Sequence, residues 1–309
     1  MNGIINFNKP VGITSCRAIN HVKKAFHSKK AGHTGTLDPN ANGVLPICIG
    51  KATQIVQFAI HLPKTYCGKM RLGIRTDSQD ADGKIISESS CEKIHLELLK
   101  NIFQKYTGSI EQIPPMFSAV RVNGRRLYTL ARKGISIARN PKKVHIYYLK
   151  LLDYEDDLVT FETKTSAGTY VRTLCDDIGN ELGCGAYLAE LTRTRVGGLK
   201  IEDSITIEDI NRSTIGNGLK DTIYSIDRAL SFFPSVKIKK EREKFVLLER
   251  KITRESIEDI NGESDTGEYF RIHNFSGKLL GIASSLLNTT PLSSCHKQEV
   301  CFKFKKLLV

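Results

Sequence analysis

The spacing of apolar and polar residues predicts a chain of strands separated by single helices. Residues 64–74 alternate like a strand, with Lys69 and Arg71 on one face and Met70 and Leu72 on the other. Similar patterns predict further strands at 3–7, 44–49, 144–151, 158–164 and 186–191, and helices at 14–26, 52–60, 90–106 and 170–182. Strands interrupted by single helices and hairpins favour an α+β fold, with a mixed, largely antiparallel sheet and flanking helices.

A change in composition near residue 233 predicts two domains. The acidic stretch 202–227 ends shortly before Phe232-Phe233-Pro234, and the segments that follow are short and strand-like. Residues 269–272 and 279–282 flank a turn and predict a hairpin of a small β-barrel, whereas the polar residues 255–268 predict a loop. We therefore expect one domain at residues 1–232 and a smaller one at residues 233–309.

The distribution of charge predicts a polyanionic partner. The chain has 309 residues and a formal net charge of +13, and its first 75 residues hold eleven cations but only one acid, Asp38. Residues 112–152 hold nine cations and no acid, and within them Asn123-Gly124 predicts a hairpin that exposes Arg125 and Arg126. Solvated surface lysines usually alternate with acids, so these tracts favour a phosphate-binding face. Nucleic acid is favoured over an anionic membrane surface.

Asp38 stands out because it is alone among cations. Such a carboxylate is held in its ionised form and is attracted to the surface that the phosphates occupy. Asp38-Pro39 is also a common turn pair, and an Asx turn would explain this aspartate without any chemistry. From this segment alone the two interpretations are equally supported.

Several classes of site and protein are disfavoured. The eight cysteines form no CxxC pair, no histidine lies at zinc-finger spacing, and the Asp77–Gly83 turn lacks the glutamate of a calcium loop, so we expect no metal. No apolar run reaches the roughly 18 residues of a membrane helix. Scattered cysteines and the absence of a leader favour the reducing cytoplasm. No phosphate-binding loop is present, which disfavours an ATP-driven helicase or ligase.

Four motifs together resemble the TruB family of pseudouridine synthases. Gly32-His33-Thr34-Gly35-Thr36-Leu37-Asp38-Pro39, continuing to Gly43-Val44-Leu45-Pro46, is similar to the catalytic loop of that family. Lys9 to Ser15 resembles its opening motif, Lys64-Thr65-Tyr66 its tyrosine strand, and Gly168 to Arg172 its arginine motif. The motifs occur in the order of the family, and the likeness covers roughly residues 3 to 200.

The resemblance implies a fold, a reaction and a partner. It implies the pseudouridine synthase fold followed by a C-terminal PUA-like β-barrel that binds RNA. It also implies an isomerase that converts uridine 55 in the T loop of tRNA to pseudouridine, as a monomer and without cofactor, DNA or membrane. Residues 113–119 and 123–134 resemble the bacterial tRNA enzymes more than the archaeal and eukaryotic guide-RNA relatives.

The resemblance also implies roles for individual residues. Asp38 would be the catalytic carboxylate, by attack at C1′, addition at C6 or abstraction of a sugar proton, which the sequence leaves open. Arg172 would pair with Asp38 and lower its pKa, and Tyr66 would stack on the target base with its hydroxyl near the sugar. His33 would fill the place that the extruded base leaves, and Lys9 and Pro10 would support the floor of the active site. Tyr170 and Leu191 would form walls of the pocket, and Arg125 and Arg126 would contact RNA phosphates.

Some residues depart from the family pattern, and two other functions are compatible with the sequence. Cys16-Arg17, Asn42 and Leu191-Thr192-Arg193 differ from the usual residues, without removing a catalytic group. One rival is a catalytically inactive RNA-binding protein or tRNA folding aid, in which Asp38 is only a turn residue. A metal-free ribonuclease is another, and it would shorten the RNA whereas an isomerase would not.

Overall fold

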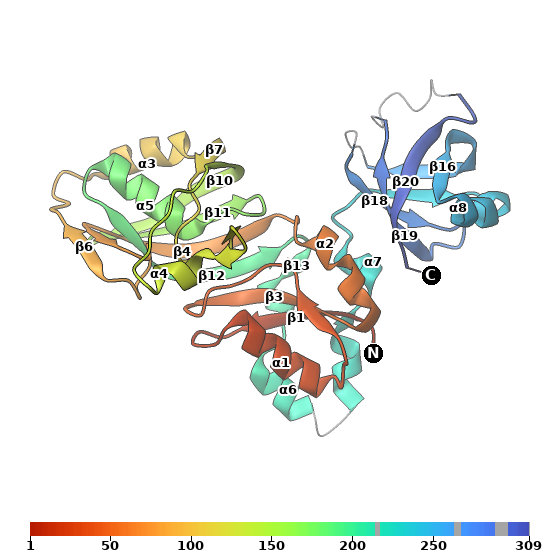
Figure 1. Cartoon of the computed structure of the whole chain (residues 1–309), viewed down its shortest axis with the longest axis horizontal. Coiled ribbons are helices and arrows are strands. Elements are labelled where there is room, and N and C mark those ends of the chain that lie inside the picture. The colour runs from red at the N-terminus through yellow and green to blue at the C-terminus, as the bar shows by residue number, and fades with distance from the viewer. Residues whose placement is uncertain (214–216, 263–266, 288–295, 309) are drawn as a thin grey trace.

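The main sheet carries the elements that surround Asp38. The computed structural model describes residues 1–213, 217–262, 267–287 and 296–308. Its larger sheet has ten described strands, and Figure 1 shows their arrangement. Eight of them follow one another in the spatial order β14 (Ile223–Tyr224), β1 (Gly3–Lys9), β3 (Ala41–Ile49), β12 (Ala186–Val196), β4 (Lys64–Leu72), β11 (Leu158–Thr165), β10 (Lys142–Glu155) and β7 (Gly108–Gln112). In addition, β2 (Ala31–His33) pairs with β3, and β13 (Leu199–Lys200) pairs with β12. Among the described strands of this sheet, only β3 and β12 pair in parallel, so the predicted mixed, largely antiparallel sheet is confirmed.

Helices cover this sheet and bury its apolar face. Figure 1 shows α3 (Leu96–Lys105) and α5 (Val171–Leu182) over the half that contains β4, β11 and β10, and α1 (Ser15–Ala25) near β1 and β3. Inward residues of these elements, such as Val22, Met70, Phe161 and Leu174, share one buried core. The shorter helices of this part are α2 (Val56–Ala59), α4 (Leu127–Ala131), α6 (Ile207–Ser213) and α7 (Ile226–Ala229). Apolar and polar residues therefore alternate along β4 because one face of the strand packs under the helices.

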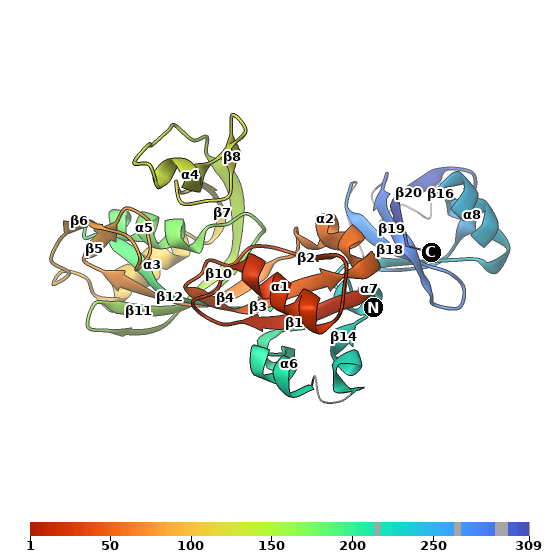
Figure 2. The ribbon, with the colours of Figure 1, turned by 60° about the horizontal axis from the view of Figure 1, so that its bottom comes forward.

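Two small hairpins extend from the main sheet. β5 (Ile74–Thr76) pairs with β6 (Ile85–Glu88), and β8 (Arg121–Val122) pairs with β9 (Arg125–Arg126). Asn123 and Gly124 both have positive φ, which is the backbone of the predicted two-residue turn. Figure 2 shows the segment with β8 and α4 projecting from the sheet. We name residues 113–140 the basic arm.

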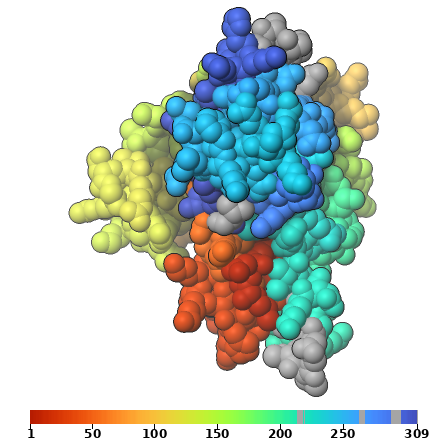
Figure 3. Space-filling view, turned by 90° about the vertical axis from the view of Figure 1, so that its right-hand side faces the viewer, coloured from red at the N-terminus to blue at the C-terminus, as the bar shows by residue number. Residues whose placement is uncertain are grey.

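The C-terminal part forms a second sheet, in the manner of a PUA-like barrel. Its strand order is β16 (Lys251–Thr253), β20 (Val300–Leu307), β19 (Leu279–Ser285), β18 (Tyr269–His273), β15 (Ser235–Ile238) and β17 (Ile257–Asn261), with α8 (Glu243–Glu249) beside it. The predicted hairpin is β18 and β19. Figure 3 shows this part against the N-terminal one, and Phe58 contacts Tyr269 with ring centroids 5.0 Å apart. The boundary between residues 232 and 233 stays a prediction.

Some sequence predictions are wrong in detail. Residues 257–261, predicted to lie in a loop, form β17, because β15 offers an edge for pairing. Residues 263–266 of that predicted loop lie outside the described residues, and so does Cys295. The helix expected from residue 90 begins only at Leu96, where His95 caps it by accepting a hydrogen bond from the Leu98 amide. The helix predicted at 52–60 is a 3-10 segment followed by α2. The strand predicted at 186–191 is longer and continues to Val196.

The β3–β12 pairing leaves no room for a side chain at Gly43. Gly43 has φ +103°, and a Cβ there would lie 2.3 Å from the Arg193 carbonyl oxygen. Gly183 has φ +80° but open space around it. We predict that Gly43→Ala lowers the free energy of unfolding by about 3–5 kcal/mol, because overpacking adds to the left-handed backbone, whereas the control Gly183→Ala costs only about 1–2 kcal/mol. Urea unfolding measures both, and equal losses would contradict the close approach.

Candidate active site

The loop between β2 and β3 holds Asp38 in a fixed backbone. The Ser15 hydroxyl donates to the Leu37 carbonyl at 2.8 Å and accepts from the Leu37 amide at 2.9 Å, and the Gly12 amide donates to the Pro39 carbonyl at 2.9 Å. Within the described residues, no hydrogen bond joins the Asp38 carboxylate to an amide of its own loop. The side chain is therefore not engaged in an Asx turn and points to other elements.

Arg172 brings the Asp38 loop together with two distant segments. It lies in the first turn of α5 and its side chain is only 7% exposed. Its Nε lies 3.1 Å from Asp38 Oδ2, its Nη1 lies 3.0 Å from Asp80 Oδ2, and its Nη2 donates to the Phe117 carbonyl at 2.9 Å. Each nitrogen of the planar guanidinium thus has a partner in a different segment, which fixes its orientation.

Two opposing effects act on the pKa of Asp38. Burial raises it and is the larger effect, Arg172 is the strongest influence that lowers it, and the nearby Asp80 raises it. The expectation that Arg172 lowers the pKa is right for that contact but wrong for the net shift, because burial outweighs the ion pair. The side chain is nevertheless 44% exposed, so water still reaches the carboxylate and its dehydration is incomplete. Arg172 and this access to water therefore both oppose the upward shift that burial causes.

Lys9 supports the same loop from below. Its side chain is fully buried, and its ammonium donates to the carbonyls of Pro10 and Ile13 at 2.8 Å and of Pro39 at 3.2 Å. Burial lowers the pKa of Lys9 to about 8, although Asp38 opposes this shift. The predicted place of Lys9 and Pro10 under Asp38 thus agrees with the contacts, while their function stays a prediction.

Arg193 is a second buried cation next to the loop, and sequence reasoning missed it. Its side chain donates to the carbonyls of Val44 at 2.7 Å, Gly35 at 3.0 Å and Thr36 at 3.3 Å, so it joins both sides of the loop. The Tyr66 hydroxyl lies close enough to raise the pKa of Arg193, against the larger lowering effect of burial. Alternation along β12 places Arg193 on the same face as Leu191, and this was the signal that could have revealed it.

The other predicted pocket residues surround this cluster at different depths. Tyr66 is 7% exposed and belongs to the main core, while Leu191 pairs with Ala41 where β3 begins. Tyr170 directly precedes α5, and its amide donates to the Gln112 side chain at 3.0 Å. His33 ends β2, accepts from the Gly35 amide at 3.1 Å, and has a pKa lowered by burial. Their contacts with RNA stay predictions.

Arg125 and Arg126 lie away from the cluster, at the exposed tip of the basic arm. Arg126 donates to the Tyr128 hydroxyl at 3.1 Å, and the guanidinium groups of Arg126 and Arg132 lie 5.9 and 5.5 Å from the centre of that ring. The root of the arm is attached to the cluster through the Phe117 carbonyl. The structure thus separates the Asp38 cluster from a charged surface beyond it.

Asp80 is the second member of the cluster that the sequence did not reveal. The sequence of its turn resembles a calcium loop without the closing glutamate and indicates no other role. Asp80 is 92 residues from Arg172 in the chain, and no local pattern indicates that their side chains meet. Among the described residues, no group of three or more metal-ligating side chains occurs. Asp80 instead competes with Asp38 for the charge of one arginine.

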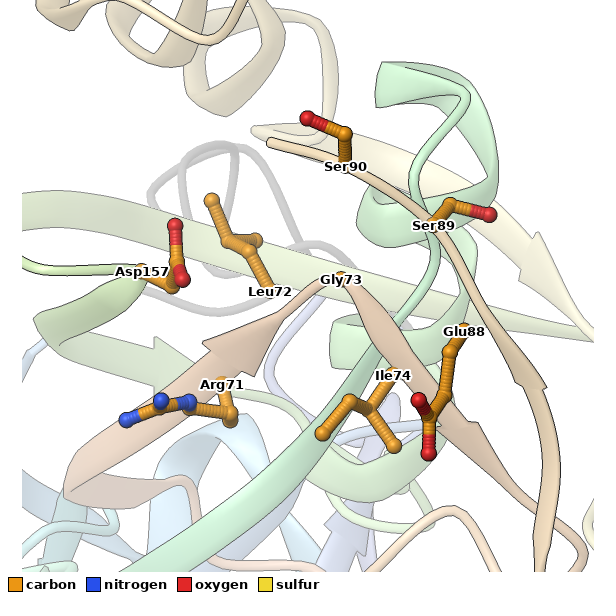
Figure 4. Close-up of a pocket in the computed structure, with 8 residues that line it drawn as sticks. All are labelled: Arg71, Leu72, Gly73, Ile74, Glu88, Ser89, Ser90 and Asp157. Atoms are coloured by element: carbon orange, nitrogen blue, oxygen red, sulfur yellow. The ribbon is translucent and has the colours of Figure 1, made fainter. Parts of the chain in front are cut away.

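A separate pocket lies at the far end of β4. It has a volume of about 400 Å³, and Figure 4 shows its lining residues, which are Arg71, Leu72, Gly73, Ile74, Glu88, Ser89, Ser90 and Asp157. No predicted site residue lines it. Tyr66, near the start of the same strand, belongs to the Asp38 cluster instead, so this pocket has no part in the candidate site.

Comparison with known proteins identifies similar chains. Residues 23–171 match the family described as TruB family pseudouridylate synthase (N terminal domain), and residues 172–231 match the tRNA pseudouridylate synthase B C-terminal domain. The tRNA pseudouridine synthase B of Clostridium acetobutylicum is 41% identical over 285 residues, which are 92% of this chain and 96% of that protein. The protein of the same name from Geobacillus kaustophilus is 43% identical over 77% of this chain and 86% of its own length.

Solved structures show the same fold. A chain in the crystal structure of a Cbf5-Nop10-Gar1 complex superimposes with a TM-score of 0.80 and 27% identity, covering 99% of this chain and 85% of that one.

No helix among the described residues is long and apolar enough to cross a membrane.

The contact between Tyr66 and Arg193 gives a stability prediction. Tyr66→Phe removes a buried hydroxyl that favours the charge of the buried Arg193, so we expect it to lower the free energy of unfolding by about 1.5–3 kcal/mol. The control Tyr147→Phe removes a hydroxyl from a ring that is 48% exposed, and we expect little change. Denaturant unfolding of both variants checks this, and equal small losses would show that the buried contact contributes nothing.

Proposed function

Because this chain belongs to the TruB family of pseudouridylate synthases, we propose that it isomerises uridine 55 in the T loop of tRNA to pseudouridine. The observation that carries the proposal is the Asp38–Arg172 ion pair, which is formed by two residues of separate family-like motifs. The relatives that match nearly the whole chain carry the name tRNA pseudouridine synthase B, which supports tRNA as the substrate.

Asp38 is the catalytic carboxylate in this proposal. The reaction breaks the bond between ribose C1′ and uracil N1, turns the base, and joins C1′ to C5, so no atom is gained or lost. An oriented carboxylate near C1′ and C6 can attack the sugar, add to the base or abstract a sugar proton. All three routes use the ionised form, which the 3.1 Å contact with Arg172 favours.

The surrounding residues position the loop and the base. Lys9, which lies beside Pro10, donates to the Pro39 carbonyl next to Asp38, and Arg193 holds Gly35 and Thr36 on the other side. We assign Tyr66, Tyr170 and Leu191 to the walls around the uracil, and His33 to the stacking place that the extruded base leaves. Extrusion costs a few kcal/mol, and stacking at about 1–3 kcal/mol per base can offset it.

The rest of the T stem-loop would lie against the basic surfaces. Arg125 and Arg126 are exposed at the tip of an arm that projects from the sheet (Figure 2), as phosphate contacts require. The PUA-like barrel, taken as residues 233–309, adds RNA contact away from the chemistry. We further propose that the chain acts on tRNA as a monomer in the cytoplasm, without DNA, membrane or cofactor.

The test is to map pseudouridine after incubation with an unmodified tRNA transcript. We predict that the wild-type protein modifies uridine 55, whereas Asp38→Asn and Asp38→Ala fold and bind tRNA but form no detectable product. Asp38→Asn keeps the shape of the side chain, and Asp38→Ala guards against deamidation back to aspartate.

The matched control is Asp156→Asn, an exposed aspartate in the β10–β11 turn, which should keep the wild-type single-turnover rate. Shortened RNA would support a ribonuclease, and tRNA binding without product by the wild-type protein would support a folding aid. Product at the wild-type rate from both Asp38 variants would exclude Asp38 as the catalytic group.

A further inference from the structure

Gln79 is anchored at every polar group it has. It lies in the turn between β5 and β6, where its amide donates to the Thr76 carbonyl at 3.2 Å and its carbonyl accepts from the Leu188 amide at 3.0 Å. Its side-chain Nε2 donates to Asp176 Oδ2 at 3.0 Å, and its Oε1 accepts from the Thr173 hydroxyl at 2.9 Å. These bonds attach the turn to both α5 and β12.

The two partners on α5 are themselves fixed. Thr173 and Asp176 are buried, and the Asp176 carboxylate also receives Arg75 Nε at 3.0 Å and Arg75 Nη2 at 3.3 Å. A carboxylate can only accept, so the NH₂ of Gln79 must face Asp176 and its oxygen must face Thr173. Thr173 directly follows Arg172, so Gln79 is bonded to the turn of helix that carries the arginine.

The residues on either side of Gln79 are the two acceptors of one Arg172 nitrogen. Nη1 of Arg172 donates to the Ser78 carbonyl at 3.2 Å and to Asp80 Oδ2 at 3.0 Å. The guanidinium is planar and rigid, so fixing Nη1 also sets the direction in which Nε points. Nε is the atom that meets Asp38.

We infer that Gln79 is a positioning residue for the isomerisation, acting through Ser78, Asp80 and Arg172 to aim the arginine at Asp38. This inference rests on the proposed function. Gln79 has φ +64°, a left-handed conformation that glycine adopts without strain, so the backbone alone would favour glycine here. A glutamine at this position supplies one donor and one acceptor, and each has its partner on α5.

The amide chemistry defines the variants. Gln79→Gly keeps the backbone conformation and removes both side-chain bonds, whereas Gln79→Glu cannot donate and places a second carboxylate against Asp176. Thr173→Val removes the hydroxyl that binds Gln79 at nearly constant shape, and Thr173→Ser restores it. The control Asp156→Gly replaces another residue with positive φ (49°), in an exposed turn remote from Arg172.

We expect Gln79→Gly, Gln79→Glu and Thr173→Val to lower the single-turnover rate at saturating tRNA by roughly 10–100-fold, because small misplacements of catalytic groups have effects of that order. The tRNA dissociation constant should stay within about twofold, since phosphate contacts dominate affinity. Thr173→Ser and Asp156→Gly should keep the wild-type rate.

A pH–rate profile separates positioning from a loss of stability. Arg172, Asp80, Lys9 and Arg193 are the charged groups near Asp38, and Arg172 is the strongest of those that lower its pKa. A misdirected Arg172 should therefore move the acid limb of the rate to higher pH in Gln79→Gly, and a change in stability alone would leave it in place.

The side-chain Nε–H resonance of Arg172 in ¹⁵N spectra gives a readout independent of activity. It should be protected from exchange in the wild type and lose protection in Gln79→Gly. An inactive wild type would refute the proposed function, and this resonance would still decide the positioning. If Gln79→Gly does not fold, the Thr173→Val and Thr173→Ser pair decides it. A wild-type rate, acid limb and Nε–H protection in these variants would overturn the inference.

Discussion

The guanidinium of Arg172 is the group on which the candidate site depends. Its three nitrogens meet the Asp38 loop, the Asp80 turn and the root of the basic arm at Phe117. These segments are far apart in the sequence, because the Asp38 loop precedes β3, the Asp80 turn joins β5 to β6, and Phe117 follows β7. α5 supplies the rigid support, because it packs on the sheet through Leu174 and Ile178 while presenting Arg172 to the loop. The site is therefore assembled by one side chain rather than by one segment.

Buried cations set the electrostatic character of this region. Lys9 and Arg193 are bound by main-chain carbonyls, and among the described residues neither forms an ion pair within 4.0 Å. Burying a charge without a counterion is costly, and carbonyl dipoles meet only part of that cost. The remaining positive potential favours a negative charge on Asp38. Burial of Asp38 acts in the opposite direction and raises its pKa, so burial and the cations compete over the charge of this carboxylate.

The sequence predicts those features that depend on local pattern. Alternation along residues 64–74 identifies β4, Asn123-Gly124 identifies the arm hairpin, and the lone acid among cations identifies Asp38. Contacts made across the fold carry no such signal. Asp80 meets Arg172 only because the β5–β6 turn returns over α5, and residues 257–261 form a strand only because β15 offers an edge. Arg193 is an intermediate case. The two-residue period of a strand predicts that its side chain points inward, but no local pattern predicts the carbonyls that it binds.

Arg172, shared between Asp38 and Asp80, is the strongest influence that lowers the pKa of Asp38. The most direct measurement is an NMR titration of the Asp38 carboxyl carbon, using ¹³C-labelled aspartate in the wild type, Arg172→Met and Asp80→Asn. We expect a higher Asp38 pKa in Arg172→Met, because a cation is lost, and a lower one in Asp80→Asn, because a competing negative charge is lost. An Asp38 pKa that is unchanged in both variants would contradict it.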